Sequence, residues 1–350
     1  FGTVEYFSIE TLTLGIFNVW LGMNSLPGAA QIAVFAFLFV IVLLVLEAYS
    51  RGRRHYSDTG RRHTSLTPIR TSGLHAGVCA AICAAPVILG FLFPVVILLG
   101  FVIQGYSIDN YAKIVEVAFN SLLIAASVAI MVMAAATVMT VEGIFHRNRL
   151  VRALTALAST GYAFPGTILA IGVVTFAGMV DDGLQVVLEG IFGLSYGGIT
   201  GTLTLVLIAC MVRFQAIGYG AMSAGVRRMP PNLLSASRVL GQGFEGTLRQ
   251  IAFPLVRSSI LAGGLLVFVD VMKELPMTLL LRPFDFDTLS TYVYQFAKDE
   301  LLERAALPAL AIVATGIGPV ILMNVALSRT GRAPASIGPL RRNPALAKAG

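Results

Sequence analysis

Seven long stretches with almost no charge constrain this chain more than any other feature. A helix needs about 20 mainly apolar residues to cross the hydrocarbon core of a bilayer. Only 12% of the 350 residues are charged, about half the share in a typical soluble domain. We therefore predict an all-α integral membrane protein, a polytopic bundle of about seven spanning helices. The expected spans are Ala29–Leu46, Ala76–Ile103, Ala118–Val141, Leu154–Val180, Ile199–Gly218, Ser258–Leu281 and Ala305–Leu327.

The basic residues set the expected orientation of these spans. Most of the 25 Lys and Arg residues fall in the connector at 51–74, after the third span, around the fifth and sixth spans, or in the tail at 329–350. Connectors rich in Lys and Arg stay on the cytoplasmic side of a membrane. We expect a multi-pass protein of the bacterial inner membrane, with the N-terminus of this chain periplasmic and its C-terminus cytoplasmic. The net charge of +7 then reflects topology, so we expect contact with membrane lipid and not with nucleic acid.

An internal repeat divides the chain. The segment "YFSIETLTLGIF" (Tyr6–Phe17) resembles "PFDFDTLSTYVY" (Pro283–Tyr294) at an offset of 277 positions. The same offset lays the first span on the last, although two apolar stretches can also agree by coincidence. We predict the end of a first unit at 1–50, a basic linker at 51–74, a six-span unit at 75–328 and a basic tail at 329–350. Because six is even, the two units would share one orientation and a pseudo-two-fold axis along the membrane normal.

Residue types that hold metals or cofactors are sparse. Cys79 and Cys83 lie four positions apart in an apolar run, which favours packing over a metal site. The sequence has no glycine-rich phosphate loop followed by lysine, and no nucleophile or paired carboxylates of the kind that enzymes use. We predict no catalytic residue, metal site or cofactor in this chain.

Charged residues fall inside the sixth expected span. Asp270, Lys273 and Glu274 lie just before Pro276. A charge at membrane depth costs about 2.5–3.5 kcal/mol on insertion scales, so such residues normally pair and face the bundle interior. The spacing allows an Asp270–Lys273 pair on one helical face. The residues either line the translocation path or its gate, or form a buried ion pair that fixes helix register.

A proline-glycine pair falls inside the fourth expected span. Pro165 and Gly166 follow Tyr162 closely, and a proline there frees backbone groups that protein or water must satisfy. Tyr162, Pro165 and Gly166 are therefore candidates for residues along the path. Alternatively, the pair only kinks a packed helix.

The connector at 226–254 is polar between two apolar spans. Its apolar residues recur at helical spacing on both sides of Gly241 and Gly243, and Pro254 leads into the next span. Glycines just past a helix end are common stop signals, so we predict two short helices joined at a glycine hinge, lying flat against the bundle. Periodicity alone favours an ordinary interfacial helix. The expected apolar faces contain Leu233, Ala236, Val239 and Leu240, then Phe244, Leu248 and Ile251.

The spacing within this connector carries a resemblance to a known family. Ala236, Gly241, Ile251 and Pro254 fit the pattern E-A-A-x(3)-G-x(9)-I-x-x-P. The chain resembles inner-membrane permeases of binding-protein-dependent ATP-binding-cassette (ABC) importers, which implies the type I permease fold. In that family the loop is a coupling helix that docks on the ATPase. Here Ser235 stands where the acidic residue is usual and Ser237 where the second alanine is, which puts a polar contact to the ATPase in doubt.

The resemblance extends over essentially the whole chain. The segments Val267–Ala297, Gly161–Val173 and Phe119–Ile130 are similar to ferric-iron importer permeases with two fused units. This implies a first permease unit that is mostly missing here, and we expect the chain to be a piece of a longer one. Permeases for thiamine, polyamines, sulfate or phosphonates share the architecture, so another small solute is the alternative cargo.

The resemblance also implies partners. Two copies of an ATPase would bind ATP and Mg²⁺ and dock on the cytoplasmic loops, and a periplasmic binding protein would deliver the cargo. A secondary transporter driven by an ion gradient is a different class of function. It would explain the charges at Asp270, Lys273 and Glu274 but not the hinged loop. An intramembrane enzyme or scaffold has weaker support.

Overall fold

The computed structural model describes residues 2–52, 72–105, 111–145, 149–193, 197–229 and 232–330, and within these ranges it has no strand. The predicted all-α class is confirmed. The short helices are α1 (Gly2–Tyr6), α2 (Leu12–Phe17), α7 (Arg149–Ala158), α10 (Asn232–Val239), α11 (Phe244–Thr247), α13 (Pro276–Leu281) and α14 (Leu289–Lys298). The longer helices are α3 (Leu26–Gly52), α4 (Gly73–Val87), α5 (Phe93–Ile103), α6 (Tyr111–Phe145), α8 (Gly166–Phe192), α9 (Leu203–Arg227), α12 (Phe253–Met272) and α15 (Leu302–Thr330). Most of the linker at 51–74 and nearly all of the tail at 329–350 lie outside the described residues.

Seven helical segments of the described chain are long and apolar enough to cross a membrane, as predicted. They are Leu26–Glu47, Gly73–Ile103, Tyr111–Gly143, Gly166–Ile191, Leu203–Arg227, Phe244–Met272 and Leu302–Ile321. The second segment is one helical path through α4, the π-helix η2 (Ile88–Leu92) and α5.

Two expected spans are wrong in their extent. The predicted fourth span, Leu154–Val180, is broken: α7 ends at Ala158, a 3₁₀ turn η4 (Gly161–Ala163) follows, and α8 begins at Gly166. The predicted sixth span, Ser258–Leu281, ends at Met272, and α13 starts separately at Pro276. In both places a proline opens the new helix or precedes it, where the missing N–H costs nothing. The prolines therefore mark helix starts and not kinks within a span.

Three helices form the centre of the bundle. α6, α9 and α12 pack against one another in pairs, and glycines let their backbones approach, as is usual between membrane helices. A methyl group on Gly218 of α9 would come within 2.6 Å of Val132, and one on Gly263 of α12 within 2.8 Å of the Ala221 methyl. These positions accept no side chain without a shift of the helices.

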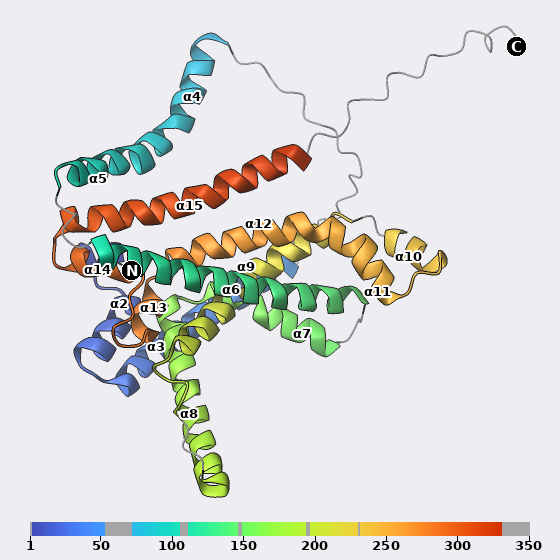
Figure 1. The fold of residues 1–350 in the computed structure, drawn as a ribbon, viewed down its shortest axis with the longest axis horizontal. Helices are drawn as coiled ribbons and strands as arrows, with labels where there is room; N and C mark the ends of the chain where they lie inside the picture. The colour runs from blue at the N-terminus through green and yellow to red at the C-terminus, as the bar shows by residue number, and fades with distance from the viewer. Residues whose placement is uncertain are drawn as a thin grey trace, which may run out of the picture.

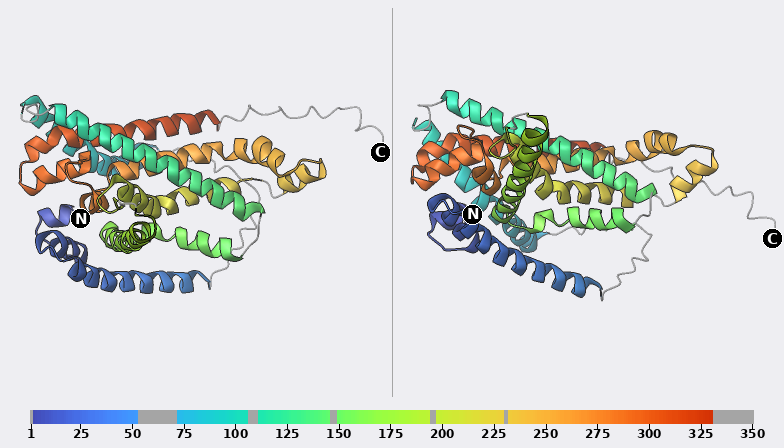
Figure 2. Two further views of the ribbon diagram at one scale, coloured as in Figure 1. Left: turned by 60° about the horizontal axis from the view of Figure 1, so that its bottom comes forward. Right: turned by 90° about the horizontal axis from the view of Figure 1, so that it is seen from below.

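The remaining long helices surround this centre. α15 runs beside α12 and contacts α5, whereas α3 packs on α8 through Ala33 and Ile168, together with Ile16 of α2. α8 crosses the other helices steeply and extends away from them (Figures 1 and 2). The described helices place α13, α14 and the N-terminus at one end of the bundle and α10 and α11 at the other (Figure 1). We name these the α14 end and the α10 end.

The backbone repeats at the offset seen in the sequence. Ser8 and Asp285, which are 277 positions apart, both have left-handed φ angles, 55° and 61°. Three residues later, Thr11 and Thr288 each cap a helix with the side-chain oxygen, and those helices begin at Leu12 and Leu289. The two segments thus share a turn, a cap and a helix start. The boundaries of the two predicted units remain predictions.

Candidate functional site

The connector between the fifth and sixth spans contains one hinge. α10 ends at Val239, and Gly241 follows with φ of 80°, a left-handed conformation that glycine adopts readily. The backbone N–H of Gln242 donates to the Ser237 carbonyl at 3.1 Å, which closes the end of the helix. Gly243 then precedes α11. A turn of α10 relative to α11 therefore requires backbone rotation at only a few residues.

The two serines that depart from the family pattern have different surroundings. Ser237 is buried, and its hydroxyl shares a 2.8 Å hydrogen bond with the Thr247 hydroxyl, which joins α10 to α11 across the hinge. An alanine here could not form this bond. Ser235 lies in α10, but its side chain is outside the described residues.

The second predicted short helix is not separate. α11 continues through the π-helix η5 (Leu248–Ala252) directly into α12, so Ile251 and Pro254 belong to one helical path that enters the span. Pro254 lies where η5 passes into α12, and its missing N–H removes one backbone hydrogen bond from this continuous helical path. The ring therefore redirects the path through a π-turn instead of ending it.

The loop does not lie flat against the bundle. In Figure 1, α10 and α11 project beyond the end of the bundle, and the described contacts of α10 are with α11. Val239 and Leu240 are more than 80% exposed, and Phe244 is about half exposed. Ala236 is also exposed. An apolar face is thus presented at the tip of a hinged projection.

A buried ion pair lies at the break between α12 and α13. Arg213 Nη1 is 3.3 Å from Glu274 Oε1, and both side chains are mostly buried. The same carboxylate oxygen accepts the backbone N–H of Met277, at the start of α13, at 3.3 Å. Arg213 is one of the basic residues that the sequence places around the fifth and sixth spans, but it lies in the middle of α9. The sequence signal that could have found it was an arginine inside an expected span.

The start of α8 closes over this ion pair. A methyl group on Gly166 would overlap the Arg213 guanidinium and come within 2.9 Å of Glu274 Oε1. The Tyr162 ring centroid lies 5.9 Å from Arg213 Cζ, close enough for a cation–π contact. Pro165 caps α8. The structure therefore brings Tyr162 and Gly166, predicted from one segment, together with Glu274, predicted from another.

The Arg213 environment retains unsatisfied polar atoms. Among the described residues, Arg213 Nε and the buried hydroxyl of Thr167 have no hydrogen-bond partner. Buried polar atoms normally find partners, because leaving one unpaired costs about 1–3 kcal/mol. The two unpaired atoms lie on α8 and α9, the helices that meet at this ion pair. The side chains around the ion pair could therefore form further hydrogen bonds.

The predicted Asp270–Lys273 pair is present. Lys273 Nζ lies 2.7 Å from Asp270 Oδ1, and the Lys273 side chain is 61% exposed. Pro276 opens α13. Two adjacent residues thus differ in role: Lys273 points outward to a local partner, whereas Glu274 points inward to a distant helix.

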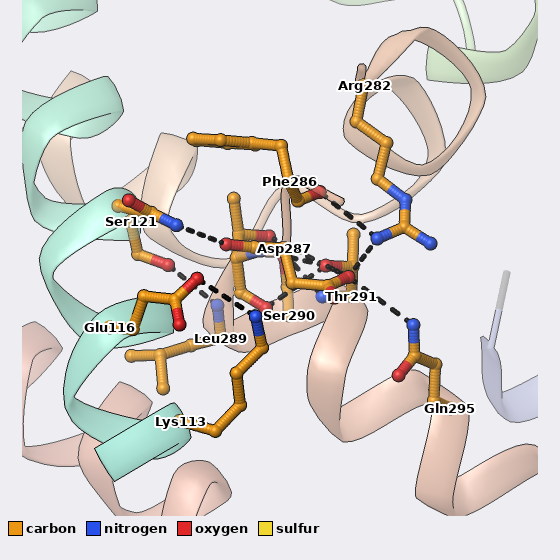
Figure 3. Close-up of polar contacts among 12 residues, drawn as sticks. Lys113, Glu116, Ser121, Arg282, Phe286, Asp287, Leu289, Ser290, Thr291 and Gln295 are labelled. Atoms are coloured by element: carbon orange, nitrogen blue, oxygen red, sulfur yellow. Dashed lines mark hydrogen bonds and ion pairs between the residues drawn. The ribbon is translucent and has the colours of Figure 1, made fainter. Parts of the chain in front are cut away.

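A polar network that we did not predict anchors α14. Asp287 accepts from Arg282, from Thr291 Oγ1 at 3.2 Å and from Gln295 at 3.3 Å (Figure 3). Asn120 of α6 donates to the Asp287 carbonyl at 3.1 Å, and Ser121 accepts the Leu289 N–H at 2.7 Å. The network fixes the start of α14 onto α6. The two bonds to α6 join residues more than 160 positions apart, so local patterns could not reveal them.

α14 is also joined to the buried ion pair. Ser290 Oγ donates to the backbone carbonyl of Glu274 at 2.8 Å. The carboxylate of Glu274 contacts α9 and its carbonyl contacts α14. Within the described ranges, no three His, Cys, Asp or Glu side chains are grouped so that they could hold a metal ion.

The chain is similar to known proteins in sequence and in structure. The chain is 24% identical over 334 residues to the Fe(3+)-transport system permease protein FbpB 2 of Haemophilus influenzae, covering 92% of this chain and 62% of that relative. No family model matches the sequence. Two solved structures of a bacterial alginate ABC transporter, one of them in complex with an alginate-bound periplasmic protein, match with TM-scores of 0.56 and 0.55.

The structural matches decide the fold. They cover 74% of this chain and 94% and 96% of the matched chains, at 17% and 14% identity. The chain has the fold of an ABC-transporter permease. The predicted resemblance to iron-transport permeases is likewise confirmed by the curated relative. The chain spans 62% of the length of that relative.

Proposed function

We propose that this chain is the transmembrane permease part of an ATP-driven importer. The hinged projection of α10 carries the proposal. It combines the family spacing of Gly241, Ile251 and Pro254 with an exposed apolar face and a left-handed glycine. A separate ATPase that binds this face would transmit its motion through α11 and η5 directly into α12.

The proposal assigns the two ends of the bundle. The α10 end would be cytoplasmic, where two ATPase subunits bind ATP and Mg²⁺, and the α14 end would be periplasmic, where a binding protein delivers the cargo. This orientation follows the basic connectors. The chain itself would contribute no catalytic group and no cofactor. A complementary first permease unit would complete the path.

Ferric iron is the proposed cargo. Its support is the similarity to one Fe(3+)-transport permease over most of this chain. Ferric ion would be held by hard oxygen ligands in the binding protein and would pass this chain as substrate. The alternative is another small solute, such as thiamine, a polyamine, sulfate or a phosphonate.

The test is coupling through the hinge. In proteoliposomes that contain the full transporter, its ATPase and its binding protein, Gly241→Val should abolish uptake of radioactive ferric iron while ATP hydrolysis continues, because valine is strained at φ of 80°. Gly243→Val is the matched control, since Gly243 has an extended backbone. Normal coupling in Gly241→Val would contradict the docking role of α10.

A secondary transporter driven by an ion gradient is a second candidate. The observation in its favour is charge within the expected spans, in the buried Arg213–Glu274 pair and the more exposed Asp270–Lys273 pair. Uptake into vesicles that lack the ATPase, driven by a proton or sodium gradient, would support it. The variant Lys273→Met distinguishes a residue that lines the path from one that only fixes helix register. If Lys273 lines the path, the variant should reduce uptake but not ATPase binding.

A further inference from the structure

Two residues at equivalent positions of the repeat contact each other. Phe17 and Tyr294 are the last matched pair of the repeat, 277 positions apart. Their rings meet edge to face, with centroids 6.2 Å apart and an interplanar angle of 84°, and both side chains are more than 90% buried. The pair lies at the α14 end, where α2 and α14 approach each other.

This contact locates a symmetry axis. When two copies are related by a two-fold rotation, contacts are reciprocal: residue i of one copy meets j of the other, and j meets i. A residue can meet its own equivalent only beside the axis. The Phe17–Tyr294 contact therefore places the pseudo-two-fold axis of the repeat between these two rings.

Next to this axis, the two copies of the repeat differ in the hydrogen bonds that they form. Tyr294 donates its hydroxyl to Glu5, 2.8 Å and 2.7 Å from the two carboxylate oxygens. The equivalent of Tyr294 is Phe17, which has no hydroxyl, and the equivalent of Glu5 is Arg282. Arg282 is bound by Asp287 within its own segment. The position equivalent to Asp287 is Glu10, which cannot pair with Glu5, so Glu5 bonds across the axis.

The Tyr294–Glu5 bond closes one side of a cavity. The cavity, of about 360 Å³, is lined by Glu5, Ser8, Leu275, Ser290 and Tyr294 among others. Burial, followed by the hydrogen bond to Glu5, raises the pKa of Tyr294, so its hydroxyl stays protonated and able to donate. Ser290, on the same helix, connects to the Glu274 carbonyl. Movement of α14 would therefore alter the ring contact, the cavity and the buried ion pair together.

We propose that Phe17 and Tyr294 form the outer gate of the translocation path, and that the Tyr294–Glu5 hydrogen bonds hold this gate closed. The inference rests on the proposed function, since a path shared by two units related by a two-fold axis runs along that axis. The structure has the rings in contact, which is the closed position. Opening requires α2 and α14 to separate and Glu5 to release the Tyr294 hydroxyl.

A reversible cross-link tests the gate. In a transporter without native cysteines, reconstituted with its ATPase and binding protein, a short bifunctional methanethiosulfonate reagent should cross-link the pair Phe17→Cys and Tyr294→Cys in the absence of nucleotide. The cross-link should stop uptake of radioactive ferric iron, and reduction should restore it. ATP with vanadate should lower the cross-linking yield several-fold because the gate opens.

The matched control is a pair within one helix. Tyr292 and Phe296 of α14 have rings 5.0 Å apart, so Tyr292→Cys with Phe296→Cys should cross-link equally in all nucleotide states and leave uptake intact. Uptake that persists through a complete Phe17–Tyr294 cross-link would overturn the gate. Failure of the cysteine-free parent to show ATP-dependent uptake would instead overturn the proposed function.

A second variant tests the hydrogen bonds alone. Tyr294→Phe keeps the ring contact but removes the hydroxyl, and a hydrogen bond to a charged group is worth about tenfold or more in an equilibrium. ATP hydrolysis without binding protein should rise about tenfold, because the gate opens without its signal. Tyr292→Phe should leave this basal rate unchanged. A wild-type basal rate in Tyr294→Phe would refute the role of Glu5 and Tyr294 in holding the gate.

Discussion

Arg213 and Glu274 show how a pair of side chains can hold a helix break at membrane depth. The carboxylate neutralises a guanidinium on α9 and accepts the first N–H of α13. The N–H of Met277, at the gap between α12 and α13, is therefore paired. This dual contact lies where the span ends at Met272, just before the charged residues Lys273 and Glu274.

Removing one partner of this pair should be costly. Glu274→Ala leaves Arg213 buried without its counter-charge, so we predict a loss of about 3–5 kcal/mol in the free energy of unfolding. Chemical denaturation in detergent would measure it. The matched control, Lys273→Ala, breaks a pair whose lysine is 61% exposed and should cost about 1 kcal/mol or less. Equal losses in the two variants would contradict a special role for Glu274.

At the scale of elements, the hinge between α10 and α11 is held by a side-chain bond. Ser237→Ala removes the hydroxyl that bonds Thr247 and leaves that buried hydroxyl unpaired. We predict a loss of about 1–2 kcal/mol for the local structure, measured as faster amide hydrogen exchange in α10. Thr315→Ala is a control, because Thr315 bonds only carbonyls of its own helix. Unchanged exchange in Ser237→Ala would show that the bond does not restrain α10.

Neighbouring glycines in α12 give a sharper test of helix packing. A methyl group on Gly263 would meet the Ala221 methyl at 2.8 Å and the Met133 sulfur at 3.0 Å, whereas one on Gly264 meets Met133 at an ordinary 3.5 Å. Gly263→Ala should therefore destabilise the bundle by about 1–3 kcal/mol. Gly264→Ala should be neutral or stabilising, because alanine favours the helix. Thermal unfolding in detergent checks both, and the reverse order would contradict the α6–α9–α12 packing.

The elements that sequence reasoning predicted correctly are those that hydropathy specifies. All seven spanning helices depend on long apolar runs, and the end of α10 depends on Gly241. The breaks at Ser159–Pro165 and at Lys273–Leu275 depend on contacts between distant helices, such as Arg213–Glu274. The anchor of α14 joins Asn120 and Ser121 to residues more than 160 positions away. Such contacts produce no periodic pattern in the local sequence. The mean hydropathy of an apolar span also does not reveal single polar residues within it.

At the scale of the whole molecule, the two ends of the bundle have different structures. The α14 end holds a network of hydrogen bonds that fixes a short helix, and the α10 end holds a hinged apolar projection (Figure 1). The buried ion pair lies at the break between α12 and α13 and is bonded to α14 through Ser290. Movement at one end can thus reach the other through α12, the helix that ends at this ion pair.

The orientation of this axis in the membrane is the remaining prediction. Val239 at the α10 end is 87% exposed, and Phe284 at the α14 end is fully exposed. In a background with Cys79, Cys83 and Cys210 replaced by alanine, an impermeant maleimide added to intact spheroplasts should label Phe284→Cys. Val239→Cys should be labelled only after the membrane is permeabilised, because Lys and Arg concentrate in the connectors at its end. Labelling of Val239→Cys in intact spheroplasts would invert the assignment, and α10 would then be out of reach of a cytoplasmic ATPase.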